Sequence, residues 1–106
     1  MRSFFTKIVG VSFENENGSA RQELIAELES VPCALSLVRE CDNPHDNNAI
    51  AVFDTKGRQL GYLSRHIADQ MSKVMDAGIH VQAHVMQVTG GWPLHYGVNI
   101  KVIYPW

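Results

Sequence analysis

Residues 48–63 read NAIAVFDTKGRQLGYL, in which two apolar segments flank a polar turn sequence. The first segment, 48–54, predicts a short strand that is buried on both faces. A turn over 54–57 follows, because Gly57 can adopt a positive φ without strain. The segment 58–63 then returns as the partner strand. The stretch therefore predicts an antiparallel hairpin near the middle of the chain.

The residues before this hairpin predict two strands and a helix. Residues 3–13 begin with β-branched and aromatic side chains and end at a polar loop, which predicts a strand. Ser19 has the spacing of a capping box, and an apolar stripe at helical spacing follows it, with Arg21 expected to lie off the stripe. Pro32 ends this helix. Residues 33–39 alternate and predict the next strand.

The residues after the hairpin predict a second helix and two strands. Ser64 is expected to cap the helix, and Gly78 to end it in a left-handed conformation. Residues 79–89 and 97–104 alternate and predict strands on either side of a Gly-Gly-Trp-Pro break. The order β-α-β-β-β-α-β-β is mainly β with two helices. It favours a small, partly open six-stranded barrel over a sandwich, because all these elements can share one core.

Composition limits the classes of function that fit the chain. It has 106 residues, with nine Lys and Arg, eleven Asp and Glu, and a formal net charge of −2. This balance excludes a protein that coats nucleic acid by bulk positive charge, but it permits a small local site. We expect a single cytoplasmic domain over 1–106, since no signal segment or membrane-spanning run is present. We also expect Cys33 and Cys41 to be reduced.

Two polar segments are candidates for a binding site. Residues 43–48, NPHDNN, combine Asn and Asp side chains with a proline, which predicts a stiff loop. Residues 61–66, GYLSRH, lie at a strand-to-helix junction, where free backbone amides suit an anion. Taken separately, the two segments favour simpler interpretations, an Asx-rich turn and a helix cap with a solvated arginine.

Together, the two segments resemble the HIRAN domain family. The string NPHDNNAIAV, followed after a short hairpin by GRQLGYLSR, is similar to the central motif of that family. VGVSF at 9–13 and the alternating strands at the end extend the resemblance over essentially the whole chain. The resemblance implies an OB-like barrel that holds the 3′ end of single-stranded DNA. It also implies a free-standing copy of a module usually found beside helicase-like ATPase domains or nucleases.

The resemblance implies roles for an acidic residue and several aromatic ones. Asp46 matches an aspartate that accepts a hydrogen bond from the terminal 3′-hydroxyl. His45 and Phe13 match tyrosines that stack on the last bases, and Tyr62 lies beside the site. Trp92 matches a further aromatic by its loop position alone. Stacking contributes about 1–3 kcal/mol per base and tolerates any sequence, so such a site needs few positive charges.

The positions that hold phosphate in the family differ here. Arg65 keeps the positive charge of a family lysine, whereas Ser12 replaces an arginine and so loses a charge-assisted contact. Arg58 and Lys101 are candidates to supply the missing charge. We expect weaker DNA binding than in the ATPase-linked members. Because His45 replaces tyrosine, we also expect binding to strengthen as the pH falls toward about 6.

Two other classes of function remain as alternatives. The first is a protein-interaction module that has lost DNA binding, which Ser12 and the negative net charge favour. The second is a metal-dependent nuclease that uses Glu14, Glu16 and Asp46, but no strand-anchored motif supports it.

A zinc site is a weak candidate. His80 and His84 have no cysteine or carboxylate at metal-ligand spacing. We therefore expect no cofactor, no metal and no enzymatic activity. The expected partners are the 3′ end of single-stranded DNA and a separately encoded helicase or nuclease, in DNA repair or replication-fork processing.

Overall fold

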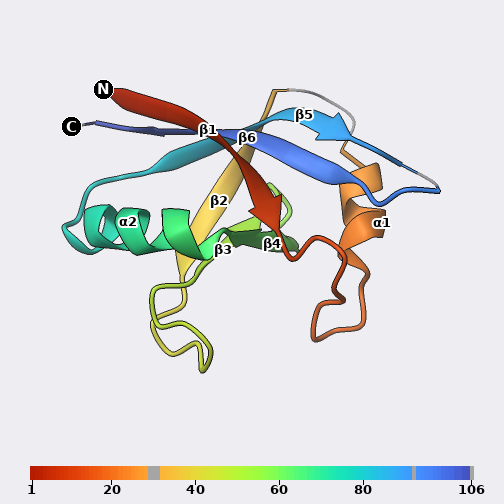
Figure 1. Cartoon of the computed structure of the whole chain (residues 1–106), viewed down its shortest axis with the longest axis horizontal. Helices are drawn as coiled ribbons and strands as arrows, with labels where there is room; N and C mark the ends of the chain where they lie inside the picture. Colours follow the sequence, from red (N-terminus) through yellow and green to blue (C-terminus); the bar gives the residue numbers. More distant parts are fainter. Residues whose placement is uncertain (29–31, 92, 106) are drawn as a thin grey trace.

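Six strands and two helices follow one another in the predicted order (Figure 1). The computed structural model describes residues 1–28, 32–91 and 93–105. The elements are β1 (Arg2–Val9), α1 (Arg21–Ala26), β2 (Cys33–Arg39), β3 (Ile50–Phe53), β4 (Gln59–Leu63), α2 (Arg65–Asp76), β5 (Gln82–Thr89) and β6 (Gly97–Tyr104). Among the described helices, none has the length and apolar character needed to cross a membrane.

The strands form one antiparallel barrel. Neighbouring strands follow the order β1-β4-β3-β2-β5-β6, and β6 pairs again with β1. The predicted class, mainly β with two helices and a six-stranded barrel, is confirmed. The barrel is closed, however, rather than partly open. The shortest strand pairing in the barrel joins β1 to β4 through two residue pairs, Ile8 with Leu63 and Val9 with Tyr62.

Gly61 makes this closing contact possible. It is a buried residue in the middle of β4. A Cβ at this position would collide with the carbonyl oxygen of Val9 and would lie 2.5 Å from Cγ2 of Ile8. Only glycine lets the β1 backbone come this close. The short-range pattern of the sequence does not reveal a contact between segments so far apart, and we therefore expected a partly open barrel.

The core lies inside the barrel and is aliphatic. Strands β3, β4, β5 and β6 contribute fully buried side chains, which include Ile50, Val52, Leu60, Val85, Val98, Ile100 and Val102. The helices lie at opposite ends of the barrel in Figure 1, where α1 contributes Leu24 and Ile25 and α2 contributes Ala68 and Met71. Burial of each large aliphatic side chain contributes about 1.5–3 kcal/mol, so this cluster is the main source of stability.

The ends of β1 and α1 differ from the prediction. β1 ends at Val9, four residues early, because Gly10 has a φ of 71° and turns the chain. The N-cap of α1 is Ala20, which makes no side-chain cap hydrogen bond. The predicted capping box is wrong, since the Ser19 hydroxyl donates to Oδ1 of Asn17 instead. Expected helical residues 29–31 lie outside the described part of the chain.

The ends of α2 follow the prediction. The Ser64 hydroxyl accepts a hydrogen bond from the Ile67 amide at 3.4 Å. At the other end, Gly78 has a φ of 82° and donates to the Met75 carbonyl, while the Ile79 amide donates to Val74. This pair of bonds is a Schellman motif, which ends helices at glycine. The beginning of α2 lies beside the 43–48 loop, where Nδ2 of Asn48 donates to Oδ1 of Asp69 at 3.1 Å.

Candidate nucleic-acid interface

The 43–48 loop is held in shape by its own side chains. The side-chain oxygen of Asn43 accepts hydrogen bonds from the amides of His45 and Asp46, at 2.9 and 3.2 Å. Oδ1 of Asp46 then accepts from the Asn48 amide at 2.9 Å. These are Asx-type turns, which fix a loop without a sheet or helix. The stiffness that the sequence indicates therefore has a direct source in this loop.

Arg65 connects this loop to the first turn of α2. Its Nη2 donates to the carbonyl oxygen of His45 at 3.1 Å, and its Nε lies 3.6 Å from Oδ2 of Asp46. The Arg65 side chain is 76% exposed, whereas that of Asp46 is 20% exposed. A groove of about 650 Å³ lies at this contact, and residues 43–48, Arg65, His66 and Asp69 line it. One accessible cation and one sheltered carboxylate thus face the same space.

Tyr62 lies on the other side of the loop and is tied to it through Glu40. The Tyr62 hydroxyl donates to Oε1 of Glu40 at 2.9 Å, and the same oxygen accepts from Nδ2 of Asn43 at 2.9 Å. The guanidinium of Arg21 lies 5.5 Å from the centre of the Tyr62 ring. The tyrosine therefore supports the loop with its hydroxyl and is covered on part of its ring.

Phe13 and Ser12 are exposed in the turn after β1. Both Phe13 and Tyr62 lie beside Gly10, where an added Cβ would be 3.6 and 3.9 Å from their rings. Phe13 is 66% exposed, so its ring is available for stacking. The last predicted site residue, Trp92, lies outside the described residues.

A second groove, of about 980 Å³, opens on the Tyr62 side of the loop. Four carboxylate side chains line it, from Glu14, Glu16, Glu40 and Asp42. His45 lines both grooves. The structure therefore groups Asp46, His45 and Arg65 on one side of the loop, and it places Tyr62 on the acidic side. Two carboxylates, Asp46 and Asp69, line the first groove with the exposed Arg65, whereas the second groove has four carboxylates with Arg21 and Arg58. Because both arginines of the second groove are already hydrogen-bonded, the exposed Arg65 makes the first groove the more favourable one for a phosphate backbone.

Neither candidate substitute for the missing arginine at Ser12 is available there. Arg58 donates to Glu27 at 2.7 Å and to Asp54 at 2.9 Å, and these two bonds raise its pKa. Lys101 lies on the outer surface of β6 and lines neither groove. Arg65 is thus the arginine or lysine that lines the groove beside Asp46.

Arg21 supports the site from a buried position that the sequence pattern did not predict. Arg21 is buried, at 7% exposure, although we expected it off the buried stripe of α1. Its Nε donates to Asn15 and its Nη1 to the carbonyl oxygen of Gly10, both at 2.8 Å. Burial of a charge requires such partners. Helical spacing alone does not reveal this burial, because the partners of Arg21 lie in the irregular segment before the helix, 6 and 11 residues earlier in the chain.

Arg39 supports the 43–48 loop from β2. Its guanidinium donates to both carboxylate oxygens of Asp76, at 3.0 and 3.1 Å, and to the carbonyl oxygens of Asn47 and Ala49. It therefore joins the end of α2 to the end of the loop. Short-range sequence patterns do not predict this contact, because it joins residues 37 positions apart.

Asp76→Asn is expected to destabilise the domain at neutral pH and not in acid. The hydrogen bonds from Arg39 lower the pKa of Asp76. Stability from such a carboxylate is fully present above its unfolded-state pKa and is lost as the pH falls through its folded-state pKa. The difference in Tm between the wild type and the variant should be largest near neutral pH. A difference that stays constant into strong acid would contradict this prediction.

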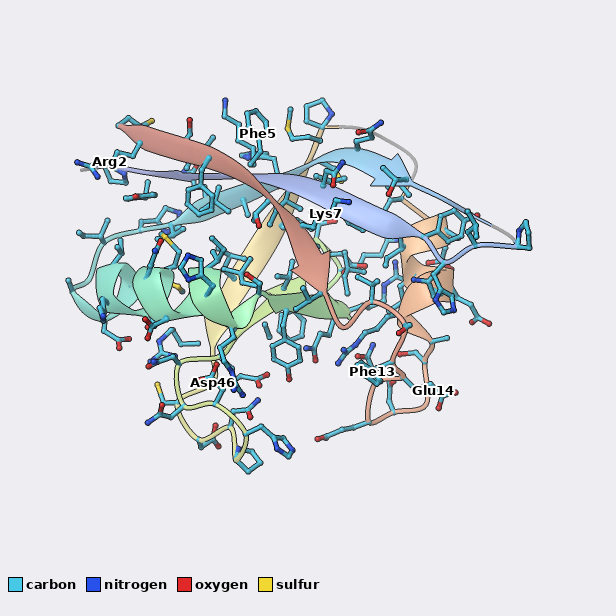
Figure 2. The ribbon with its side chains drawn as sticks, in the orientation of Figure 1. Arg2, Phe5, Lys7, Phe13, Glu14 and Asp46 are labelled. Atoms are coloured by element: carbon cyan, nitrogen blue, oxygen red, sulfur yellow. The ribbon has the colours of Figure 1, made fainter. Side chains whose placement is uncertain are left out.

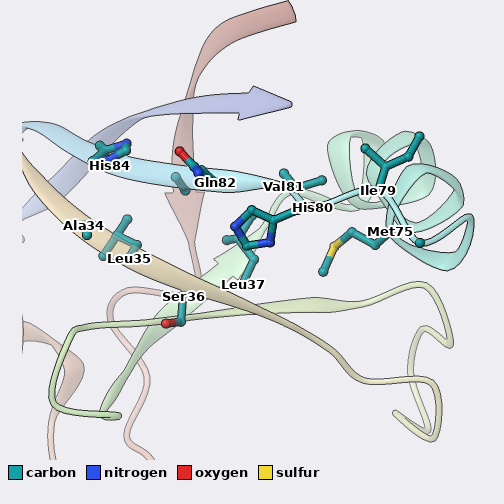
Figure 3. Close-up of a pocket in the computed structure, with 12 residues that line it drawn as sticks. Ala34, Leu35, Ser36, Leu37, Met75, Ile79, His80, Val81, Gln82 and His84 are labelled. Carbon is teal, nitrogen blue, oxygen red and sulfur yellow. The ribbon is translucent and has the colours of Figure 1, made fainter. Parts of the chain in front are cut away.

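One further cavity, two histidines and the two cysteines lie outside the grooves described above. A cavity of about 690 Å³ opens between β2, β5 and the end of α2 (Figure 3). His80 and His84 both line it, but β5 begins at Gln82, so His80 lies before the strand rather than on it. Within the described residues, no three His, Cys, Asp or Glu side chains are placed to hold a metal. Cys33 and Cys41 are free thiols, and burial raises the pKa of Cys33.

Comparison with known sequences identifies the family. A model of the HIRAN domain matches residues 1–106. The chain belongs to the HIRAN domain family. It is 43% identical over 65 residues to the helicase-like transcription factor of Oryctolagus cuniculus, and 43% identical over 42 residues to that of Mus musculus. These matches cover 61% and 40% of the chain, but only 6% and 4% of the two relatives.

Solved structures of two other chains share the fold. The HIRAN domain of human HLTF superimposes with a TM-score of 0.72 at 20% identity, over 96% of this chain and 74% of that one. A protein from Lactobacillus plantarum gives a TM-score of 0.70 at 22% identity, over 95% and 97% of the two chains. The HIRAN barrel is therefore confirmed, and membership of the family is consistent with a nucleic-acid-binding module.

Proposed function

We propose that this HIRAN domain is a non-catalytic module that binds the 3′-hydroxyl end of single-stranded DNA. The observation that carries the proposal is the Asp46–Arg65 pair at the groove beside α2. A carboxylate accepts a hydrogen bond from a free hydroxyl and repels a terminal phosphate. A cation 3.6 Å away neutralises the adjacent phosphate of the same strand.

The surroundings of this pair support one polarity for the strand. His45 is exposed, precedes Asp46 in the loop and lines both grooves. Phe13 offers a second exposed ring, beside Gly10. We infer that the last bases stack on these rings and that the backbone follows Arg65.

The test compares three matched single strands by fluorescence anisotropy. They carry a 3′-hydroxyl, a 3′-phosphate, or a 3′ end hidden in a hairpin. We expect the free hydroxyl to bind most tightly and the other two to bind weakly. Because few phosphates are contacted, we expect a shallow dependence of affinity on salt. Equal affinity for the three ligands, or no binding at low salt, would contradict the proposal.

Affinity for the 3′-hydroxyl strand is expected to rise as the pH falls from about 8 to about 6. A histidine gains positive charge over this range and then attracts phosphate. His45→Tyr should remove the increase. His66 lines the same groove, so His66→Gln is the matched control and should retain it. Equal wild-type affinity at the two pH values would remove the charge of His45 from the mechanism.

The acidic groove also favours a second candidate function, a protein-interaction module that no longer binds DNA. Four carboxylates line the larger groove, and such a surface suits a basic protein segment. Capture of one basic partner protein, together with a failed DNA titration, would support this alternative. A DNA partner and a separately encoded helicase or nuclease remain the expected partners of the first candidate.

A further inference from the structure

The outer surface of β1, β6 and β5 is positively charged, although the formal net charge of the chain is −2. None of the eleven acidic residues of the chain lies on these three strands. Arg2, Lys7 and Lys101 do, and they are three of its nine basic residues. The other three strands lack acidic residues as well, so the helices and the segments between the elements contain all the negative charge. An anionic ligand meets no repulsion from within this face.

The same face has an exposed aromatic ring on β1. Phe5 is 69% exposed, although phenylalanine usually lies inside a protein. The amine of Lys101 lies 5.7 Å from the centre of its ring. Lys101 pairs with Phe5 on one side and with His84 on the other, so these three side chains form one row across the strands. We call the surface around this row, with Lys7, the Phe5 face.

The cations of the Phe5 face are free to bind a ligand. In residues 1–28, 32–91 and 93–105, the ion pairs use Arg39, Arg58 and Arg65, and neither Lys7 nor Lys101 forms one. A shallow groove of about 660 Å³ crosses the face beside Phe5 and Lys7. In Figure 2, Arg2, Phe5 and Lys7 lie along β1, on the side of the molecule away from Asp46.

We propose that the Phe5 face binds a second segment of single-stranded nucleic acid, 5′ of the end that the Asp46 groove holds. The proposal rests on the proposed function. Lysines beside an exposed aromatic ring are what sequence-tolerant binding of a single strand requires, since the lysines pair with phosphates and the ring stacks on a base. A second copy of the chain is a poorer occupant, because two such faces would repel each other.

β1 leads from the Phe5 face to the turn that contains Phe13. Its alternate residues Phe5, Lys7 and Val9 are all exposed, and Gly10 and Phe13 follow directly. Residues two apart on a strand are separated by about 6.6–6.8 Å, so Phe5 and Val9 span about 13 Å. A strand whose last bases stack at Phe13 can continue along this row. Short oligonucleotides would occupy only the Asp46 groove, whereas longer ones would also cover the Phe5 face.

The test uses oligonucleotide length. A tetranucleotide and a dodecanucleotide, both with a free 3′-hydroxyl, are titrated against wild type, Lys7→Gln/Lys101→Gln and Phe5→Ala. The exposed lysines Lys56 and Lys73 provide a matched double variant with the same change in net charge. We expect Lys7→Gln/Lys101→Gln to reduce the salt slope for the dodecanucleotide by about 1 to 2 and to leave the tetranucleotide unchanged.

Phe5→Ala should weaken dodecanucleotide binding by about fivefold or more. The proposal is wrong if both double lysine variants bind the dodecanucleotide with the same affinity and salt slope. It is also wrong if wild type binds phosphatidylserine vesicles through these lysines while oligonucleotide affinity stays unchanged. Circular single-stranded DNA separates this proposal from the proposed function, because it has no 3′ end. If wild type binds circular DNA and Lys7→Gln/Lys101→Gln does not, the Phe5 face is supported even where no preference for a 3′-hydroxyl exists.

Discussion

Asp46→Asn is expected to abolish the preference for a free 3′-hydroxyl over a 3′-phosphate. A hydrogen bond to a charged group contributes about 1.5–3 kcal/mol, which is about 10- to 100-fold in affinity. Asparagine keeps an Oδ1 atom that can accept from the Asn48 amide, so the loop keeps its shape. The negative charge that repels a terminal phosphate is lost. Anisotropy titrations of the two strands measure the ratio directly.

Two control variants separate the carboxylate from general electrostatics. Asp69 lines the same groove, and Asp69→Asn makes the same change in charge there. It should leave the hydroxyl preference intact. Arg65→Ala should weaken all strands alike, since it removes a phosphate contact and not the hydroxyl acceptor. If Asp46→Asn retains the full preference, or Asp69→Asn loses it, Asp46 is not the group that recognises the strand end.

Gly61→Ala is expected to destabilise the barrel by about 1–3 kcal/mol or more. The added methyl group would collide with the backbone of Val9, and backbone cannot rotate away as a flexible side chain can. For a domain of this size, each kcal/mol corresponds to a fall in Tm of about 4–8 °C. Thermal unfolding followed by circular dichroism measures the change.

Hydrogen exchange locates this effect within the barrel. Amide protection should fall where Ile8 pairs with Leu63, and it should persist where Phe5 pairs with Lys101. Gly57→Ala is the control, because its φ of 77° is strained by any side chain although nothing lies within 4 Å. That variant should lose stability without loss of protection at the Ile8 contact. An unchanged Tm in Gly61→Ala would contradict the role of Gly61 in closure.

The elements of this fold were predictable because short-range patterns determine them. Alternation in 97–104 gave β6 with its observed bounds, and Ser64 and Gly78 marked the two ends of α2. Closure of the barrel was not predictable, since it depends on a non-local approach between Gly61 and Val9. The predicted cap of α1 was wrong for a local reason instead, because the Ser19 hydroxyl bonds to Asn15 and Asn17 in its own loop.

The candidate site was predictable only in part. Resemblance to the family identified the 43–48 loop and Arg65, and the structure brings these residues to one groove. The resemblance did not reveal the hydrogen bonds of Tyr62 to Glu40 and of Arg39 to Asp76, because these residues are 22 and 37 positions apart. The acidic groove was also hidden, since its carboxylates come from segments that meet only in the folded barrel.

The pairing of Arg2 with Tyr104 has a practical consequence for any attachment to this domain. Both chain ends leave the barrel at one point, away from the 43–48 loop in Figure 1. A tag, a surface tether or a fused protein joined at either end therefore leaves the Asp46 groove open. The same attachment crowds Phe5, which is three residues from Arg2 along β1. Immobilised and freely diffusing protein should thus agree for short oligonucleotides and diverge for long ones.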